Sequence, residues 1–323
     1  MATPFLFGLR NLLPDLNIDV IGCMYVADIF HRCSAIDRLL AYDKRRGIGA
    51  EISVLRRNRP ENGWEISFVL PRSFSSALVS FLSGAKRRIG YGGDCRSFLL
   101  TDTLPGSDFQ SEHLSHIYMR LIEKINGKPI KEVPLPVVVP PNGWREVVER
   151  KGLSEEYVVL APGATYGSAK LWPPDRYASL ASRIADKFQF PIVTIGKLEE
   201  RSVGSHIIES AGVEGRNLAG ECTIEELLAV LRGAYVVIGN DSGPVHLSAA
   251  MGRPTVTIFG SSSPAWTAPR GTATEIVKGE VECAPCFNRE CPEKDPRCLL
   301  AIGVNDVYNA ALRLIGEDHI EKS

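Results

Sequence analysis

Polar side chains interrupt two apolar runs in the segment GNDSGPVHLSAAMGRP, residues 239–254, and their types suit the binding of an anion. The predicted turn between the two runs consists of Asn240, Asp241, Ser242 and Gly243. This turn precedes a predicted helix at 244–251, whose free N–H groups and dipole attract negative charge. His246 falls in the first turn of that helix and would face the same ligand. The alternative is a plain helix cap by Asp241 or Ser242, without a ligand.

A second turn of this kind lies in APGATYGSAKLWPPDRYASLA, residues 161–181. A predicted strand ends there in the glycine-containing turn 162–165. Lys170 lies in the loop that follows, where its ammonium suits a phosphate; a solvated surface lysine is the alternative. The turn holds neither GxxxxGK followed by Ser or Thr nor GxGxxG, which excludes a P-loop and a dinucleotide fingerprint. Two phosphate-compatible turns in one half of the chain predict a nucleoside-diphosphate site.

Short apolar runs alternate with amphipathic segments along the chain, which predicts a doubly wound α/β architecture with parallel sheets. The predicted strands are 17–22, 64–70, 157–163, 190–196, 235–240 and 254–260. The predicted helices are 5–14, 76–84, 174–188, 223–233, 242–252 and 304–316, the last capped by Asn305 or Asp306. Four prolines in 132–142 mark a boundary between a domain at 1–138 and a domain at 139–323.

The composition excludes several classes of protein. Of the 323 residues, 44% are hydrophobic and 23% are charged, which is typical of a soluble globular protein. The net charge of −1 argues against nucleic-acid binding, and no apolar run approaches the ~20 residues of a membrane span. Residues 1–14 lack the features of a secretion signal. Eight cysteines in a chain of this length indicate a cytosolic protein rather than a disulfide scaffold.

Four of these cysteines are clustered in CAPCFNRECPEKDPRC, residues 283–298. They are Cys283, Cys286, Cys291 and Cys298. The spacing C-x2-C-x4-C-x6-C is compatible with a small structural zinc or iron–sulfur site. Four reduced thiols, or a disulfide formed on oxidation, are the alternatives.

The net charge is a sum over the whole chain, so it does not reveal two local basic stretches, at 44–49 and 85–96. A basic patch at either stretch would suit acidic sugars and phospholipid head groups. A solvated basic face, which is common in soluble proteins, is the alternative.

The segments 161–173 and 239–269, together with 66–101, resemble the ADP-heptose:lipopolysaccharide heptosyltransferases, most closely the heptosyltransferase II type. These enzymes belong to glycosyltransferase family 9, and the resemblance covers nearly the whole chain. It implies the GT-B fold, in which two Rossmann-like doubly wound domains face a cleft. It also implies inverting transfer of L-glycero-D-manno-heptose from ADP-heptose to the lipopolysaccharide inner core.

The resemblance assigns the donor to the C-terminal domain. Thr165 and Lys170 match positions that contact the donor phosphates, and the turn after residue 239 matches the one that holds the pyrophosphate and sugar. Glu199 or Glu200 matches a glutamate that contacts the nucleoside. The donor-site residues are thus Thr165, Lys170, Glu199, Glu200, Asn240, Asp241, Ser242, Gly243 and His246. A helix N-terminus and a basic side chain cradle the departing diphosphate, so no cofactor is required for transfer.

The resemblance assigns the acceptor, a lipid A core that carries acidic Kdo sugars, to the N-terminal domain. The plausible acceptor-facing residues are Arg72, Ser73, Ser76 and Arg88; each could equally be a surface residue or a cap. The acceptor is embedded in the membrane, so we expect a cytoplasmic monomer with peripheral contact at the inner face of the cytoplasmic membrane. The final helix is expected to pack back toward the N-terminal domain, as in other GT-B proteins.

The start of the chain departs from the family pattern. Family members begin with a strand and a Gly-Asp turn, whose aspartate is the expected catalytic base, and then continue into a helix that resembles residues 1–14. The sequence begins inside that helix, so we expect the N-terminal domain to lack its first strand and this base. As written, the chain should bind donor better than it turns over.

Two alternatives stay beside heptosyl transfer to the inner core. The first is another family 9 glycosyltransferase with a different sugar or acceptor. The second is a nucleotide-sugar-binding protein without turnover. A preference for ADP over UDP and NAD would favour a heptosyltransferase.

Overall fold

The computed structural model describes residues 1–31, 33–106, 109–130, 142–293 and 295–316. The chain divides into two compact units, Met1–Pro136 and Val137–Ser323. The boundary predicted at 138/139 lies outside the described residues. Across the described residues, every helix is too short or too polar to cross a lipid bilayer.

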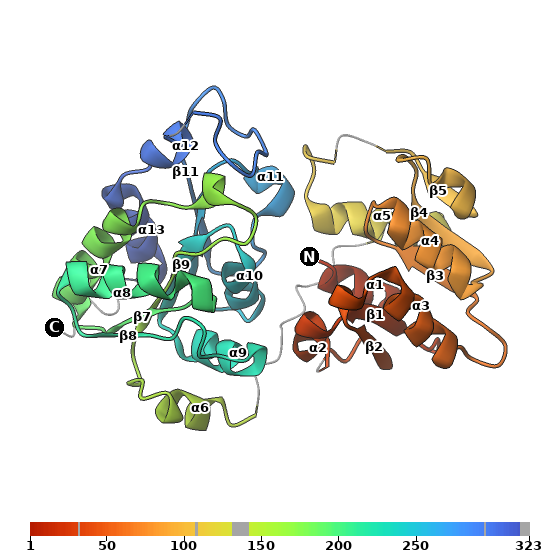
Figure 1. Cartoon of the computed structure of the whole chain (residues 1–323), viewed down its shortest axis with the longest axis horizontal. Coiled ribbons are helices and arrows are strands. Elements are labelled where there is room, and N and C mark those ends of the chain that lie inside the picture. The colour runs from red at the N-terminus through yellow and green to blue at the C-terminus, as the bar shows by residue number, and fades with distance from the viewer. Residues whose placement is uncertain (32, 107–108, 131–141, 294, 317–323) are drawn as a thin grey trace. The chain divides into compact units, whose positions relative to one another are not determined.

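The strands of the first unit form two separate parallel sheets, with the orders β1–β2 and β3–β4–β5 (Figure 1). Their bounds are Asp19–Cys23 for β1, Arg38–Tyr42 for β2, Ile66–Val69 for β3, Arg87–Tyr91 for β4 and Asp102–Leu104 for β5. Within the described residues, no hydrogen-bonded strand pair joins the two sheets. Every residue of β1 is only half-buried. The prediction that the N-terminal domain lacks its first strand stays a prediction.

Helices flank these two sheets. They are α1 (Thr3–Leu12), α2 (Met24–Phe30), α3 (Ile48–Arg57), α4 (Phe74–Ser83) and α5 (Leu114–Asn126), with 3-10 turns at Lys44–Arg46 and Ser97–Leu99. Helix α4 begins two residues before the predicted start because Ser73 caps it: its Oγ accepts the N–H of Ser76 at 3.2 Å. Helix α1 packs on α5, and its Phe5 lies edge-on to Phe68 of β3 at 5.1 Å.

The second unit is built on a six-stranded parallel sheet with the order β11–β10–β9–β6–β7–β8. The strands are β6 (Val158–Ala161), β7 (Ile192–Thr194), β8 (Gly215–Asn217), β9 (Val236–Asn240), β10 (Thr255–Phe259) and β11 (Thr274–Lys278). Every residue of β6, β9 and β10 is buried, as expected for strands covered on both faces. The strand order reverses between β6 and β9, which makes this pair the topological switch point.

The helices of the second unit cover both faces of this sheet. They are α6 (Trp144–Arg150), α7 (Pro174–Phe188), α8 (Arg201–Ala211), α9 (Ile224–Gly233), α10 (Gly243–Ala250), α11 (Pro264–Thr267), α12 (Arg297–Leu300) and α13 (Val304–Ile315). The 3-10 turns are Ser168–Lys170 and Leu198–Glu200. Ile238 points into the core with α7 and α13, whereas a Cβ at Gly239 would meet Val245 of α10. Successive residues of a strand face opposite ways, so α10 lies on the other face.

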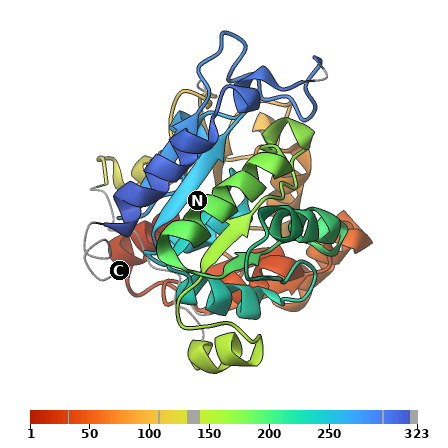
Figure 2. The same cartoon turned by 90° about the vertical axis from the view of Figure 1, so that its left-hand side faces the viewer.

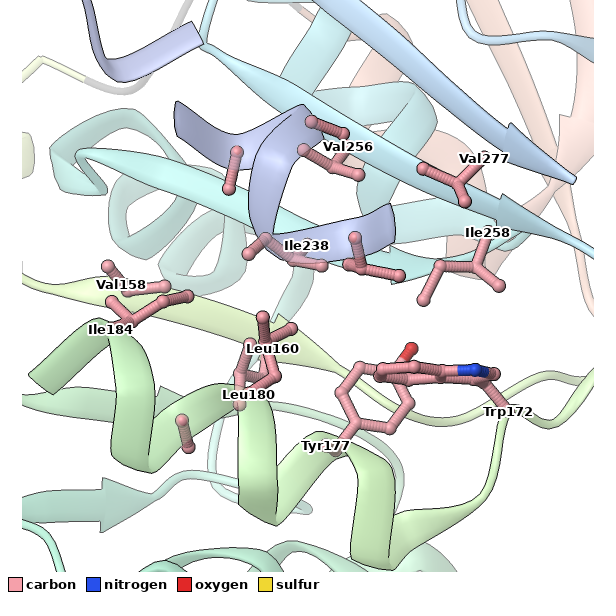
Figure 3. Packing of buried hydrophobic residues seen from close by; sticks show 14 of the residues in the cluster. Val158, Leu160, Trp172, Tyr177, Leu180, Ile184, Ile238, Val256, Ile258 and Val277 are labelled. Carbon is pink, nitrogen blue, oxygen red and sulfur yellow. The ribbon is translucent and has the colours of Figure 1, made fainter. Parts of the chain in front are cut away.

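The main core lies between the sheet and helices α7 and α13 (Figure 2). Helix α7 buries Tyr177, Leu180, Ala181 and Ile184, which recur at the i, i+3, i+4, i+7 spacing of one helix face. Figure 3 shows Tyr177, Leu180 and Ile184 beside Val158 and Leu160 of β6. The apolar period of 174–188 is thus explained by packing on the central strands.

Helix α13 packs on α7, β10 and β11 of its own unit. The N-cap residue is Gly303, so neither predicted residue holds that position. Asp306, one of the two, is the third residue of the helix, and its Oδ2 accepts the N–H of Gly303 at 2.7 Å. The other, Asn305, instead accepts a hydrogen bond from Arg183. The predicted packing of this helix toward the N-terminal domain stays a prediction.

Candidate functional site

Three loops meet at the carboxyl edge of the second sheet. The loops follow β6, β9 and β10, which are adjacent in the order β10–β9–β6. In open α/β sheets, ligands bind outside the carboxyl ends of the strands at the switch point. The two phosphate-compatible turns predicted from the sequence, 162–165 and 240–243, therefore lie at the edge where such a ligand binds.

Asp241 is the centre of this edge, and its side chain is only 3% exposed. Its Oδ2 pairs with the ammonium of Lys170 and also accepts hydrogen bonds from Ser262 Oγ at 2.7 Å and Thr267 Oγ1 at 3.3 Å. Its Oδ1 lies 3.2 Å from His246 Nε2. The carboxylate therefore ties residues from all three loops to α10. We call this set of five residues the Asp241 cluster.

The charge state of Asp241 follows from these partners. Burial alone raises the pKa of a carboxyl group, but the hydrogen bond from His246, the charge of Lys170 and the hydroxyl of Ser262 outweigh it. Together they lower the pKa of Asp241 to about 2. The group is thus a carboxylate at neutral pH, and a weak base.

The start of α10 is open to a ligand. Ser242 is the N-cap residue, but its side chain accepts no hydrogen bond from the helix, so the plain-cap alternative does not account for it. A Cβ added at Gly243 would meet no atom within 4 Å. The space beside Gly243 at the N-terminus of α10 is therefore open, and a helix N-terminus favours an anion.

Three buried polar atoms near the Asp241 cluster have no hydrogen-bond partner among the described residues. They are Ser242 Oγ, Ser261 Oγ and Trp266 Nε1. An unpaired buried polar atom costs about 1–3 kcal/mol, so such atoms are rare unless a ligand or water completes them. Their position beside α10 and Lys170 indicates a polar ligand.

Asn240 has a different place from its neighbours. Its side chain is fully buried; the amide donates to the carbonyl of Pro162 at 2.6 Å, and its oxygen accepts from Trp172 N–H and Tyr177 Oη. These bonds join the loops after β6 and β9. Asn240 thus positions the turn instead of facing the open edge.

The structure distinguishes between the two candidate glutamates. Glu200 lies against the turn after β6, since a Cβ at Gly163 would collide with its carboxylate, and it accepts the N–H of Lys197 at 2.7 Å. Glu199 is exposed. Thr165 is also exposed and has no hydrogen bond to a described residue.

The cysteine-rich segment packs directly on the loop that carries Lys170. The carbonyl of Phe287 accepts from Tyr166 Oη at 2.7 Å, and the carbonyl of Arg289 accepts from Ala169 N–H at 3.0 Å. The N–H of Phe287 in turn donates to Ser261 at 2.8 Å. These bonds fix the segment beside the Asp241 cluster.

The thiols of this segment are free. Cys298 is buried, and the other three are exposed or half-buried. In the part of the chain that the structure describes, no three His, Cys, Asp or Glu side chains are gathered as metal ligands. The zinc or iron–sulfur site stays a prediction, which metal analysis of the purified protein would check.

Three of the four predicted acceptor residues lie together in the first unit, at the end of β3. Ser73 and Ser76 exchange hydrogen bonds at the start of α4, and the guanidinium of Arg72 lies 3.6 Å from the ring centre of Phe109. Arg88 is not in this group. It pairs with Ser67 near the start of β3, and its guanidinium donates to the carbonyls of Leu99 and Ala85.

Arg96, which the sequence analysis did not select, takes the place expected for Arg88. It is fully buried and donates to the carbonyls of Tyr91, Pro71 and Ser73. Its Nη2 has no partner among the described residues. The sequence signal was present in the basic stretch 85–96, but a linear sequence does not tell which arginine turns inward.

Ser262 and Thr267 were also missed as site residues. Both follow β10, which neighbours β9, so their loop meets the turn of Asp241 at one edge. The run SSSPAWT after an apolar strand was the available signal.

The model of glycosyltransferase family 9 (heptosyltransferase) matches residues 53–296. The chain belongs to glycosyltransferase family 9. Lipopolysaccharide heptosyltransferase 2 of Escherichia coli K12 is 28% identical over 285 residues, which cover 84% of this chain and 81% of that protein. The family 9 membership explains the long motifs around Lys170 and Asp241.

Two solved structures have the same fold. The ADP-heptose lipopolysaccharide heptosyltransferase II of E. coli is 23% identical, has a TM-score of 0.81 and covers 100% of this chain and 95% of its own. A family 9 glycosyltransferase from Veillonella parvula is 19% identical, has a TM-score of 0.84 and covers 97% and 92%. The GT-B fold predicted from the sequence is thus confirmed.

Proposed function

We propose that the chain transfers L-glycero-D-manno-heptose from ADP-heptose to the lipopolysaccharide inner core, with inversion at the anomeric carbon. The observation that carries the proposal is the Asp241 cluster, with Lys170 and the open start of α10 beside three unpaired polar atoms. Family membership and the names of the heptosyltransferase 2 relatives support the choice of sugar and acceptor.

The diphosphate of the donor would lie against the first N–H groups of α10. Lys170 is held in place by Asp241, so its ammonium is oriented before a ligand arrives. Charge that develops on the departing ADP is then stabilised by groups that need no rearrangement. The hydroxyl of Ser242, which has no partner among the described residues, and the imidazole of His246 would bind the same diphosphate. Glu200, which lies beside Gly163, would contact the nucleoside.

Inverting transfer also needs a base that takes the proton of the acceptor hydroxyl. Asp241 is unsuited to this role, because four donors engage its carboxylate and its pKa is about 2. The family resemblance assigns the base to an aspartate that precedes the first helix. The Asp241 cluster therefore serves the donor, and proton removal is a separate task.

The acceptor would lie on the first unit, where Arg72 and the start of α4 offer a positive surface to an acidic sugar. Arg96 stabilises this turn by donating hydrogen bonds to the carbonyls of Pro71 and Ser73. We place the protein, as a monomer, at the inner face of the cytoplasmic membrane, where such an acceptor is embedded.

Calorimetric titration with ADP, ADP-heptose, UDP and NAD tests the donor class. We expect ADP and ADP-heptose to bind, and Lys170→Met to weaken ADP binding by about 1–3 kcal/mol, the value of a hydrogen bond to a charged group. Lys187→Met, an exposed lysine on α7, is the matched control and should change nothing.

Removal of Lys170 also leaves Asp241 without its cation, so the double variant Lys170→Met, Asp241→Asn restores neutrality. If the double variant folds like the wild type and still binds ADP weakly, the loss comes from the phosphate contact. A preference for UDP or NAD would refute the proposal. Binding of ADP-heptose without transfer to a Kdo-bearing acceptor would favour a sugar-nucleotide-binding protein instead.

A further inference from the structure

The two basic stretches of the first unit differ in how many of their cations are buried or paired with a carboxylate. In 85–96, Lys86 pairs with Glu65 at 2.6 Å and Arg87 pairs with Asp102 at 2.9 Å. Arg96 is fully buried. Arg88 is half-buried and donates to the carbonyls of Leu99 and Ala85. Of the four cations of this stretch, two are thus paired with carboxylates and one is fully buried.

The other basic stretch, 44–49, belongs to the longer segment 43–57, in which most cations are not paired with a carboxylate. It contains five basic and two acidic residues. Arg45 pairs with Asp43 at 3.1 Å, but its side chain remains 91% exposed. Lys44, Arg46 and Arg56 form no ion pair with any described residue. The loop before α3 and the end of α3 thus form an exposed cationic surface on a chain whose net charge is −1.

Large apolar side chains are exposed beside these cations. Met24 and Tyr25, at the start of α2, are 61% and 63% exposed, and Ile48, at the start of α3, is 38% exposed. An open hollow of about 610 Å³ is lined by residues of both kinds, among them Met24, Val54, Arg45, Arg46 and Arg57, together with Asp43. We call this surface, residues 24–25 and 43–57, the α2–α3 face.

Apolar side chains mixed with free cations fit one kind of partner best. Phosphates of an anionic bilayer attract Lys and Arg, while the acyl boundary accepts Met, Tyr and Ile. A nucleic acid would satisfy the cations but would bury neither Met24 nor Ile48. Exposed apolar side chains that lie together, bordered by polar residues, often mark an interaction site.

We propose that the α2–α3 face docks the protein on an anionic phospholipid bilayer. Lys44, Arg46 and Arg57 pair with lipid phosphates, and Met24 and Ile48 enter the interface. The inference rests on the proposed function in one respect, since a membrane-embedded acceptor gives the docking its purpose.

Co-sedimentation of the full chain with vesicles tests the docking without donor or acceptor. Vesicles of phosphatidylcholine with phosphatidylglycerol should bind the protein, vesicles of phosphatidylcholine alone should not, and added salt should release it. The variant Lys44→Glu, Arg46→Glu should bind at least tenfold more weakly. Met24→Ser, Ile48→Ser should reduce the binding that survives at high salt.

The control carries the same charge change elsewhere: Lys128→Glu, Lys187→Glu, both exposed, should bind like the wild type. Equal binding to both vesicle types, or unchanged binding by the Lys44, Arg46 variant, would overturn the proposal. Binding that appears only when acidic sugars are present in the vesicles would also overturn it, in favour of acceptor recognition.

A transfer assay separates this inference from the proposed function. With a detergent-dispersed acceptor, the Lys44, Arg46 variant should transfer at the wild-type rate; with the acceptor in vesicles, it should be slower. If the wild type transfers to neither acceptor, the proposed function fails, and vesicle binding still reports on the face.

Discussion

Parallel strands have different surroundings in the two units. In the second unit every residue of β9 and β10 is buried, because each strand has a neighbour on both sides and helices on both faces. In the first unit every residue of β1 keeps part of its surface exposed, and its sheet has only two strands. An apolar run thus indicates a strand, but the burial of that strand depends on which neighbours complete the sheet.

The two carboxyl edges differ in the same way. Asp241 in the second unit is a buried anion matched by a cation and three further donors. Arg96 in the first unit is a buried cation whose hydrogen bonds go to neutral oxygens, and its Nη2 has no partner among the described residues. The buried charge of the second unit is thus paired directly with an opposite charge, whereas that of the first unit is held by neutral groups.

The largest expected effect comes from breaking the buried pair of the second unit. Asp241→Ala leaves Lys170 without a counter-charge, which typically costs about 3–5 kcal/mol. Urea denaturation followed by tryptophan fluorescence measures the loss, since Trp172 and Trp266 lie in this unit. A loss below about 1 kcal/mol would mean that the pair is solvated and not a fixed part of the site.

Truncation of one core residue in each unit sharpens the comparison of the sheets. Ile258→Ala in β10, fully buried, should lower the free energy of unfolding by about 3–4 kcal/mol, because the sheet cannot close over the cavity. Ile21→Ala in β1, half-buried, should cost roughly 1 kcal/mol, because less apolar surface is lost. Equal losses in urea denaturation would contradict the difference in burial.

Acid should lower the free energy of unfolding of the second unit between pH 4 and pH 2. The pKa of Asp241 is lowered from 3.8 to about 2 on folding, so its ionised form stabilises the folded state by about 2 kcal/mol above pH 4. That contribution should disappear as the pH falls from 4 toward 2. Unfolding free energies of the wild type and Asp241→Asn across this interval measure it. The two curves would stay parallel if Asp241 titrated normally.

The smallest effect is expected at the surface of the first unit. Lys86 and Glu65 pair at 2.6 Å, but both side chains are about two-thirds exposed. Lys86→Ala should therefore change the stability by no more than about 0.5 kcal/mol. A larger loss in the same denaturation assay would show that exposed pairs hold the half-open sheet together.

Much of the second unit could be predicted from the sequence. The runs 157–163, 235–240 and 254–260 contain β6, β9 and β10, because continuous apolar residues are typical of strands buried on both faces. Five strands were missed, namely β2, β4, β5, β8 and β11. Their apolar stretches are short, and β2 and β4 each begin with arginine.

The site was predictable where one motif holds its residues and unpredictable where distant segments meet. Asp241 and Lys170 were selected because each follows an apolar strand in a glycine-containing turn. The pairing of these two residues, the inward turn of Arg96 and the choice of Glu200 over Glu199 depend on strand order and side-chain direction. Local patterns do not encode either property.

The carbonyls of Phe287 and Arg289 accept hydrogen bonds that hold the cysteine-rich segment against the loop of Lys170. Gly167 fits beneath this segment only because it lacks a side chain: a Cβ there would collide with the Arg289 carbonyl. A shift of the cysteine-rich segment would therefore displace the loop that carries Lys170, because these hydrogen bonds join the two.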